Sequence, residues 1–244
     1  AVMAPTSVSL VSDSFPENKQ GIPMGIITSG VYIGIGITLL GGGFLIDYLT
    51  ELGGLNLPII GYVKPWQATF MLVGIPGLFV SLGAFLLREP NRPEQQTNLD
   101  TTQNQPNVFL HVKEHKKTLI PMFGGLIFMA LIFYSFTFWA PTMMIRTYGI
   151  SLTEVGFLLG IITIISSITG TILAGTAVDF LRNRNYSDAP IRAAMIAVLL
   201  ALPPIVLLSF VNSELAAWVC IAFYLLFISS FAPLGLLAIS GVSP

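Results

Sequence analysis

Residues 20–46 read QGIPMGIITSGVYIGIGITLLGGGFLI, 27 consecutive positions without a charged side chain. An ionised group at the centre of a bilayer costs at least about 2.5 kcal/mol, and about 20 apolar residues in a helix are enough to cross one. This stretch therefore predicts a transmembrane helix. Five more uncharged runs, each longer than the roughly 20 residues needed to cross a bilayer, predict six membrane spans in all; they are residues 65–87, 118–145, 155–178, 193–213 and 215–244.

Composition supports lipid as the solvent for most of the surface. Charged residues make up 9% of the 244 positions, where a soluble domain usually has about 25%. Mean hydropathy is +0.80, and the net charge of −1 gives no basic field for nucleic acid. We expect an all-α fold, a polytopic membrane helical bundle in a lipid bilayer, with no nucleic-acid partner.

The two ends of the chain suggest a piece of a longer protein. Residues 1–12 are uncharged but would form a helix of only about 18 Å, too short to cross a bilayer. The sequence does not begin with Met, and it stops inside an apolar run. We expect a bundle that is truncated at both ends.

Basic residues predict the orientation. Nine of the 11 Lys and Arg residues fall in connections on one side of the predicted membrane, and only Lys64 and Arg146 fall on the other. The basic side is therefore expected to be cytoplasmic. This predicts a multi-pass protein of the plasma (inner) membrane with the Arg88–Lys117 linker in the cytoplasm. Tryptophans at span ends on the opposite face agree with an interfacial belt: Trp66, Trp139 and Trp218.

The polar linker divides the chain into three parts. We expect residues 1–88 to be the second part of an N-terminal bundle, 89–117 the linker, and 118–244 the first part of a C-terminal bundle. Residues 107–117 predict a short amphipathic surface helix. His111 and His115 lie on it four positions apart, but two ligands without a third predict no metal site.

Local motifs mark helix starts and close helix packing. Ser151-Leu-Thr-Glu154 is a capping box, and Ser187-Asp-Ala-Pro190 combines a cap residue with an early proline. In the first span, small residues on two faces predict a helix between two neighbours, either packed statically or able to slide. The two faces are Gly30, Gly34 and Gly41 on one side and Gly21, Gly25, Gly36 and Gly43 on the other.

Polar groups inside the spans are the candidates for a substrate cavity. Pro141 and Pro233 each free the carbonyl four residues earlier, at Thr137 and Ser229. At membrane depth, water in a cavity or a neighbouring helix must satisfy such a carbonyl, and both possibilities stay open. The full set of cavity candidates is Tyr32, Tyr134, Thr137, Trp139, Ser166, Tyr224 and Ser229.

Chemistry by an enzyme is not expected. The six runs contain no His, Asp, Glu, Lys or Arg, so they offer no acid, base or metal cluster at membrane depth. We therefore predict no catalytic residue, no metal and no cofactor.

Several segments resemble the major facilitator superfamily over essentially the whole chain. Residues 66–92, which include GIPGLFVSLGAFLLREPNR at 74–92, are similar to its sixth helix. Residues 138–160, FWAPTMMIRTYGISLTEVGFLLG, and 175–184, GTAVDFLRNR, resemble the seventh and eighth helices of the Spinster-like branch. The resemblance implies the major facilitator fold, with this chain covering about helices four to ten.

The resemblance also implies a function. It implies a secondary active transporter of a small organic solute or lipid-like molecule, driven by a proton or ion gradient and working by alternating access. Spinster-like relatives move lysolipids or sphingoid lipids. An organic-anion/proton symporter of the same superfamily is the alternative, and a membrane channel or structural scaffold is the alternative from another class.

Gating residues follow from the same resemblance. Gly175 and Asp179 match the family's loop motif, although Phe180 and Arg182 depart from its strict form, and the Gly-Pro step of the antiporter motif is absent from the first full span. We expect Asp13 and Asp179 to be gating groups and not proton carriers. The predicted gating or structural set is Asp13, Gly30, Gly34, Gly41, Arg146, Glu154, Gly175 and Asp179.

Overall fold

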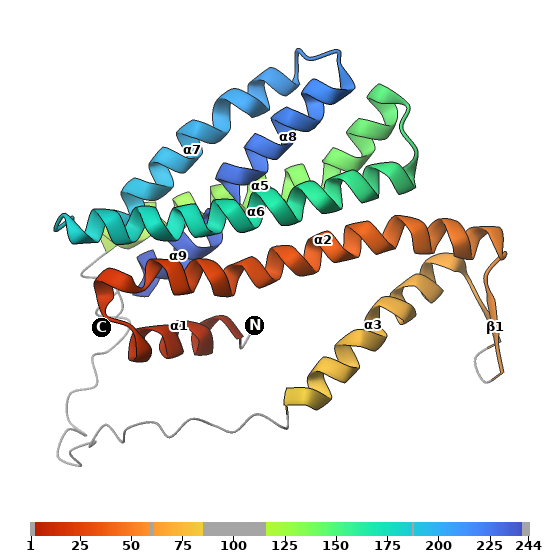
Figure 1. The fold of residues 1–244 in the computed structure, drawn as a ribbon, viewed down its shortest axis with the longest axis horizontal. Coiled ribbons are helices and arrows are strands. Elements are labelled where there is room, and N and C mark those ends of the chain that lie inside the picture. Colours follow the sequence, from red (N-terminus) through yellow and green to blue (C-terminus); the bar gives the residue numbers. More distant parts are fainter. Residues whose placement is uncertain (1–2, 59–60, 85–115, 187, 241–244) are drawn as a thin grey trace. The chain divides into compact units, whose positions relative to one another are not determined.

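Long helices dominate the chain. The computed structural model describes residues 3–58, 61–84, 116–186 and 188–240. Figure 1 shows the helices in chain order: α1 (Met3–Ser14), the 3-10 turn η1 (Glu17–Lys19), α2 (Gly21–Glu51), α3 (Pro65–Ala84), α5 (Lys116–Tyr148), α6 (Leu152–Asn183), α7 (Ala189–Leu208), α8 (Glu214–Ile228) and α9 (Phe231–Ser240).

The predicted membrane spans are confirmed by length and composition. Within the described residues, six helical segments are long and apolar enough to cross a bilayer, the last one running from Glu214 to Ile239 through α8 and α9. Several helices extend past the uncharged runs because charged residues are tolerated at helix ends outside the apolar layer. The all-α, membrane-bundle prediction therefore holds.

Contacts divide the chain into two compact units, residues 1–47 with 126–243 and residues 48–125. This grouping differs from the predicted division at the linker, which stays a prediction. Linker residues 89–115, with His111 and His115, lie outside the described residues.

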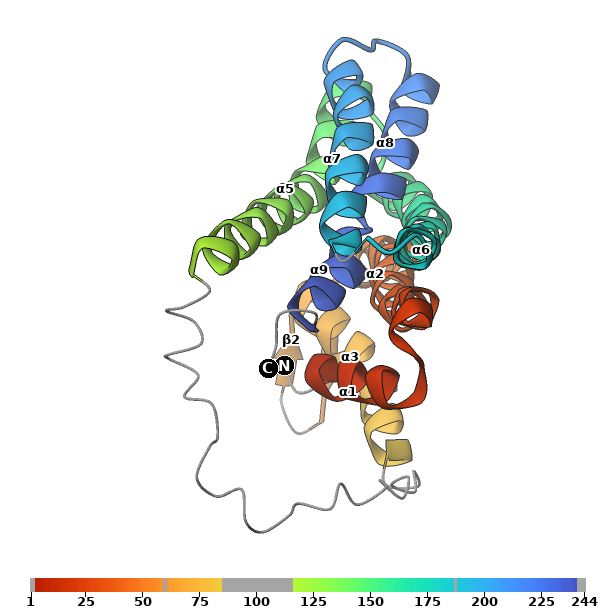
Figure 2. The ribbon, with the colours of Figure 1, turned by 90° about the vertical axis from the view of Figure 1, so that its left-hand side faces the viewer.

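The first unit has its main core where α5, α6, α7 and α8 meet. Phe133, Met144, Ile221 and Tyr224 are buried there, and Tyr32 of α2 belongs to the same cluster. In Figures 1 and 2, α7 and α8 lie side by side. One helix from the first part of the chain thus shares a core with helices from the last part.

In the second unit, a short hairpin that the sequence pattern does not predict connects α2 to α3. Strands β1 (Leu55–Leu57) and β2 (Gly61–Val63) pair antiparallel with Leu55 opposite Val63. Val63 is buried with Leu49 and Ala68. Three-residue strands are too short to produce a readable alternation of apolar and polar residues, which explains the omission.

The turn between α5 and α6 forms as its sequence predicts. Gly149 has φ 71°, a left-handed conformation that ends α5. The Glu154 N–H then donates a hydrogen bond to Ser151 Oγ at 3.2 Å and caps α6. The cap prediction for Ser151 is confirmed.

Losing this cap has a measurable cost. We expect Ser151→Ala to lower the free energy of unfolding by about 1 kcal/mol because a free N–H of the first turn loses its acceptor. Ser151→Asp keeps an acceptor and serves as the control. Thermal unfolding of the purified protein measures both variants, and equal melting temperatures for alanine and aspartate would contradict the capping role.

The start of α7 differs from the prediction. Its N-cap is Asp188, which makes no side-chain cap hydrogen bond; Ser187 lies outside the described residues. Arg192 Nε donates instead to Asp188 Oδ1 at 2.7 Å, and this hydrogen bond lowers the pKa of Asp188. Pro190 stands in the first turn, as predicted.

Candidate functional site

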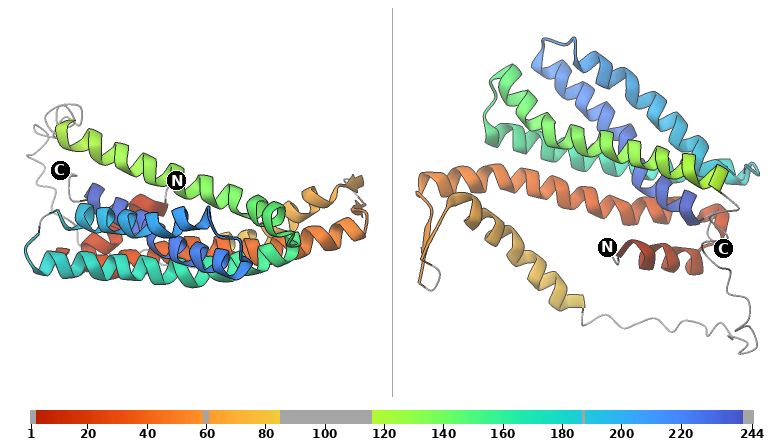
Figure 3. Two further views of the ribbon diagram at one scale, coloured as in Figure 1. Left: turned by 90° about the horizontal axis from the view of Figure 1, so that it is seen from above. Right: turned by 180° about the vertical axis from the view of Figure 1, so that it is seen from behind.

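Helices α2 and α6 run along one another in opposite directions (Figure 3) with their backbones in contact. A Cβ atom built on Gly25 would lie 2.6 Å from the Thr171 carbonyl oxygen, and one on Gly160 would lie 2.8 Å from the Gly36 carbonyl oxygen. Each step along α2 is matched, to within one residue, by a step back along α6. The contacts pair Gly21 with Gly175, Gly25 with Thr171, Gly36 with Gly160, Leu39 with Gly156 and Gly43 with Thr153.

Only one of the two glycine faces of α2 makes these contacts. A Cβ atom built on Gly30, Gly34 or Gly41 would meet no described atom within 4 Å. The glycine face in close contact meets α6, and no neighbour lies against the other glycine face among the described residues. The gating role of Gly30, Gly34 and Gly41 stays a prediction.

Asp179 closes one end of the α2–α6 contact. Its carboxylate accepts hydrogen bonds from the Gly21 N–H at 2.8 Å and the Ile22 N–H at 3.1 Å. These N–H groups belong to the first turn of α2 and have no partner within that helix. The side chain is buried, with 8% of the residue exposed. A negative charge here also meets the positive end of the α2 dipole.

Gly175 makes this approach possible, because it brings the α6 backbone against Gly21. Two further polar contacts join the same segments: Asn18 Nδ2 donates to Asn183 Oδ1 at 3.1 Å, and Arg182 Nη1 donates to Gln20 Oε1 at 3.5 Å. The whole junction, residues 18–22 with 175–183, is called the Asp179 latch below.

Asp13 lies outside the latch. It is exposed, and its carboxylate accepts a hydrogen bond from Ser9 Oγ at 3.4 Å on the same helix, α1. Its gating role stays a prediction.

At the opposite end of the α2–α6 contact, Thr153 Oγ1 donates to Asp47 Oδ2. No sequence motif singles out either residue. The available signal is weak, since Asp47 is only the first charge after the uncharged run that ends at residue 46. Arg146, in the last turn of α5, and Glu154, in the first turn of α6, are both exposed near this end.

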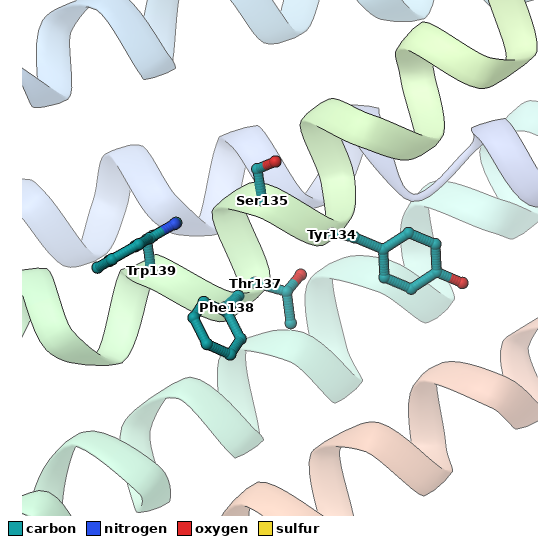
Figure 4. Close-up of a pocket in the computed structure, with 5 residues that line it drawn as sticks. All are labelled: Tyr134, Ser135, Thr137, Phe138 and Trp139. Atoms are coloured by element: carbon teal, nitrogen blue, oxygen red, sulfur yellow. The ribbon is translucent and has the colours of Figure 1, made fainter.

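An open cavity of about 480 Å³ lies against α5. Three of the predicted cavity residues line it, namely Tyr134, Thr137 and Trp139, together with Ser135 and Phe138. Figure 4 shows these side chains spread around one stretch of the helix. The lining combines aromatic rings with hydroxyl groups and carries no charge among the described residues.

The other predicted cavity residues lie in the packed interior. Tyr32, Ser166, Tyr224 and Ser229 are each at most 8% exposed. Tyr224 donates from its hydroxyl to the Ile132 carbonyl at 3.3 Å, and its ring packs on Phe136. Each tyrosine therefore has the hydroxyl partner that burial requires. A role for these four in substrate binding stays a prediction.

Long apolar helices with charges confined to their ends define an integral, multi-pass membrane protein. The family model of the Major Facilitator Superfamily matches residues 1–244, so the chain belongs to that family of membrane transporters. An MFS-type efflux pump from Mycolicibacterium smegmatis (strain ATCC 700084 / mc(2)155) is 24% identical over 183 residues, which is 74% of this chain. The match covers 38% of that relative's length. No solved structure matches.

Proposed function

We propose that this chain forms part of a secondary transporter that carries a small organic or lipid-like molecule across the membrane by alternating access. The α2–α6 contact is the observation that carries the proposal. It joins a helix before the linker to a helix after it, and polar groups hold it at both ends. In alternating access, such a contact closes one side of the bundle and separates when that side opens.

The Asp179 latch is suited to reversible closure. Its hydrogen bonds join a carboxylate to free N–H groups at a helix start, and both partners can be hydrated when they separate at the membrane surface. The basic residues place this end on the predicted cytoplasmic side. We therefore assign the latch to the cytoplasmic gate, with no cofactor involved.

The α5 cavity is the proposed binding site for the substrate. Its aromatic and hydroxyl lining fits a neutral or amphipathic molecule better than a small anion, which favours a lipid-like solute over the organic-anion alternative. The segment around Trp139 and Glu154 supports the Spinster-like branch as part of the proposal. Because the mycobacterial relative is named an efflux pump, we extend export to this chain as part of the same proposal.

Counterflow in proteoliposomes tests the transporter assignment. The full-length protein is reconstituted, and uptake of radiolabelled lysophosphatidylcholine and of benzoate is followed with and without unlabelled solute inside. Saturable counterflow of the lysolipid is the expected result. Saturable counterflow of benzoate alone would favour the anion symporter, and unsaturable flux would favour a channel.

Substitution in the cavity tests its role. We expect Tyr134→Ala to raise the KM for the transported solute about fivefold, because an aromatic contact is worth about 1 kcal/mol. Tyr134 is 63% exposed and lines the cavity. Phe128, also on α5 and 68% exposed, does not line it and provides the matched control. An equal rise in KM for Phe128→Ala would contradict a specific site.

A further inference from the structure

A hydrogen bond in the middle of the first unit joins α2 to the break between α8 and α9. The Tyr32 hydroxyl donates to the Ser229 carbonyl at 2.7 Å, and these residues are 197 positions apart in the chain. Tyr32 is 2% exposed, and its ring meets the edge of Phe133 at a centroid distance of 5.7 Å. A helix from the first part of the chain thus places a polar group inside the core of the last part.

Pro233 explains why this carbonyl needs a partner. A proline at position 233 has no N–H to give to the carbonyl four residues earlier. The first backbone bond of α9 runs from the Leu234 N–H to the Ser230 carbonyl at 3.2 Å, one residue further along the chain. The Tyr32 hydroxyl therefore replaces one missing backbone hydrogen bond.

Ser167 on α6 contacts the same residue, Ser229, and carries a second buried hydroxyl. Its hydroxyl is the buried side-chain oxygen without a hydrogen-bond partner in the described part of the chain. The residue is 0% exposed, and its own carbonyl accepts a bond from Ser229 Oγ at 3.4 Å. An unpaired buried hydroxyl is costly in the state that holds it, so a second state in which the hydroxyl is paired gains stability relative to this one.

We propose that the Ser229 carbonyl is exchanged between two donors during transport. Tyr32 holds it when α2 is packed against α6, as in this structure, and Ser167 takes it when α2 moves away. Without the exchange, separation of α2 would leave an unpaired carbonyl at membrane depth, at a cost of several kcal/mol. The exchange lowers the free-energy barrier between the state with α2 packed against α6 and the state with α2 moved away. The break between α8 and α9 then has two hydrogen-bonded arrangements, one for each state. This inference rests on the proposed alternating-access function.

The test measures how often α2 and α6 separate. Spin labels are attached to Lys19→Cys and Arg184→Cys in the full-length protein with Cys220 replaced by alanine, and distances are measured in nanodiscs. Both labelled positions are exposed. We expect Tyr32→Phe to raise the separated population about fivefold and Ser167→Ala to lower it about fivefold, the effect of losing one neutral hydrogen bond in one state.

Pro233→Ala supplies the decisive background. Residue 233 then has an N–H for the Ser229 carbonyl, so we expect both substitutions to change the populations less than twofold there. Tyr62→Phe is the matched control, because it removes a phenol hydroxyl at an exposed position that does not line the α5 cavity. Variants that do not fold would be recognised by size-exclusion chromatography, and Tyr32→Leu, which also lacks a side-chain donor, then replaces Tyr32→Phe.

Four outcomes overturn the inference. Shifts of the same sign for Tyr32→Phe and Ser167→Ala would exclude an exchange, and so would no shift for either. Undiminished effects in the Pro233→Ala background would assign them to packing. A single distance between the two spin labels that does not change under any condition would also contradict the proposed function. Two distance populations that these substitutions leave unchanged would contradict the exchange alone.

Discussion

Replacing Gly170 by alanine is expected to destabilise the folded transporter by about 3 kcal/mol, the upper part of the usual cost of overpacking. A Cβ atom there would overlap the Leu226 carbonyl oxygen and lie 2.6 Å from Ser229 Oγ and 2.8 Å from the Leu226 carbonyl carbon. Backbone atoms of α8 cannot rotate away as a side chain can. Thermal unfolding and the monodisperse fraction after purification measure the loss.

Gly34→Ala is the matched control. The substitution is chemically identical and also lies inside a membrane helix, but the new Cβ atom would meet no described atom within 4 Å. Because alanine favours a helix over glycine by about 0.5–1 kcal/mol, we expect unchanged or slightly raised stability. Equal losses of stability in the two variants would contradict this explanation. They would mean that the protein requires glycine itself and not the close approach of α8 to α6.

This contrast shows which features of the bundle the sequence can predict. The cost of a buried charge acts at each position by itself, so the gaps between charges located the spans without any knowledge of their neighbours. The Ser151 cap is equally local. Whether Gly170 or Gly34 is tightly packed depends on a second helix far along the chain, and the two glycines look alike in sequence.

Contacts between residues far apart in the chain limited the prediction of the site in the same way. Pro233 predicted that the Ser229 carbonyl loses its backbone donor, but the choice between cavity water and a neighbouring helix required the position of Tyr32. The glycine pattern predicted two contact faces on α2, and the contact with α6 had to be seen. Asp179 was assigned by resemblance, and the structure supplied its partners, the first N–H groups of α2.

The second large effect concerns that carboxylate. We expect Asp179→Ala to weaken closure of the Asp179 latch by about 2 kcal/mol, because two hydrogen bonds to a charged acceptor are lost at a helix start. The closed population then falls about 30-fold relative to the open one. Disulfide cross-linking between Asn18→Cys and Asn183→Cys reports closure, since the native side chains lie within hydrogen-bond distance at 3.1 Å.

Asp188→Ala is the control for charge, because that exposed carboxylate pairs only locally with Arg192 and should leave the cross-linking rate unchanged. Unaltered cross-linking in Asp179→Ala would remove the gate assignment. Asp179→Asn separates gating from proton transfer, since it keeps a side-chain acceptor but cannot carry a proton. A gating group should affect proton-coupled uptake and counterflow alike in that variant. Loss of proton-coupled uptake with counterflow intact would instead identify Asp179 as a proton carrier.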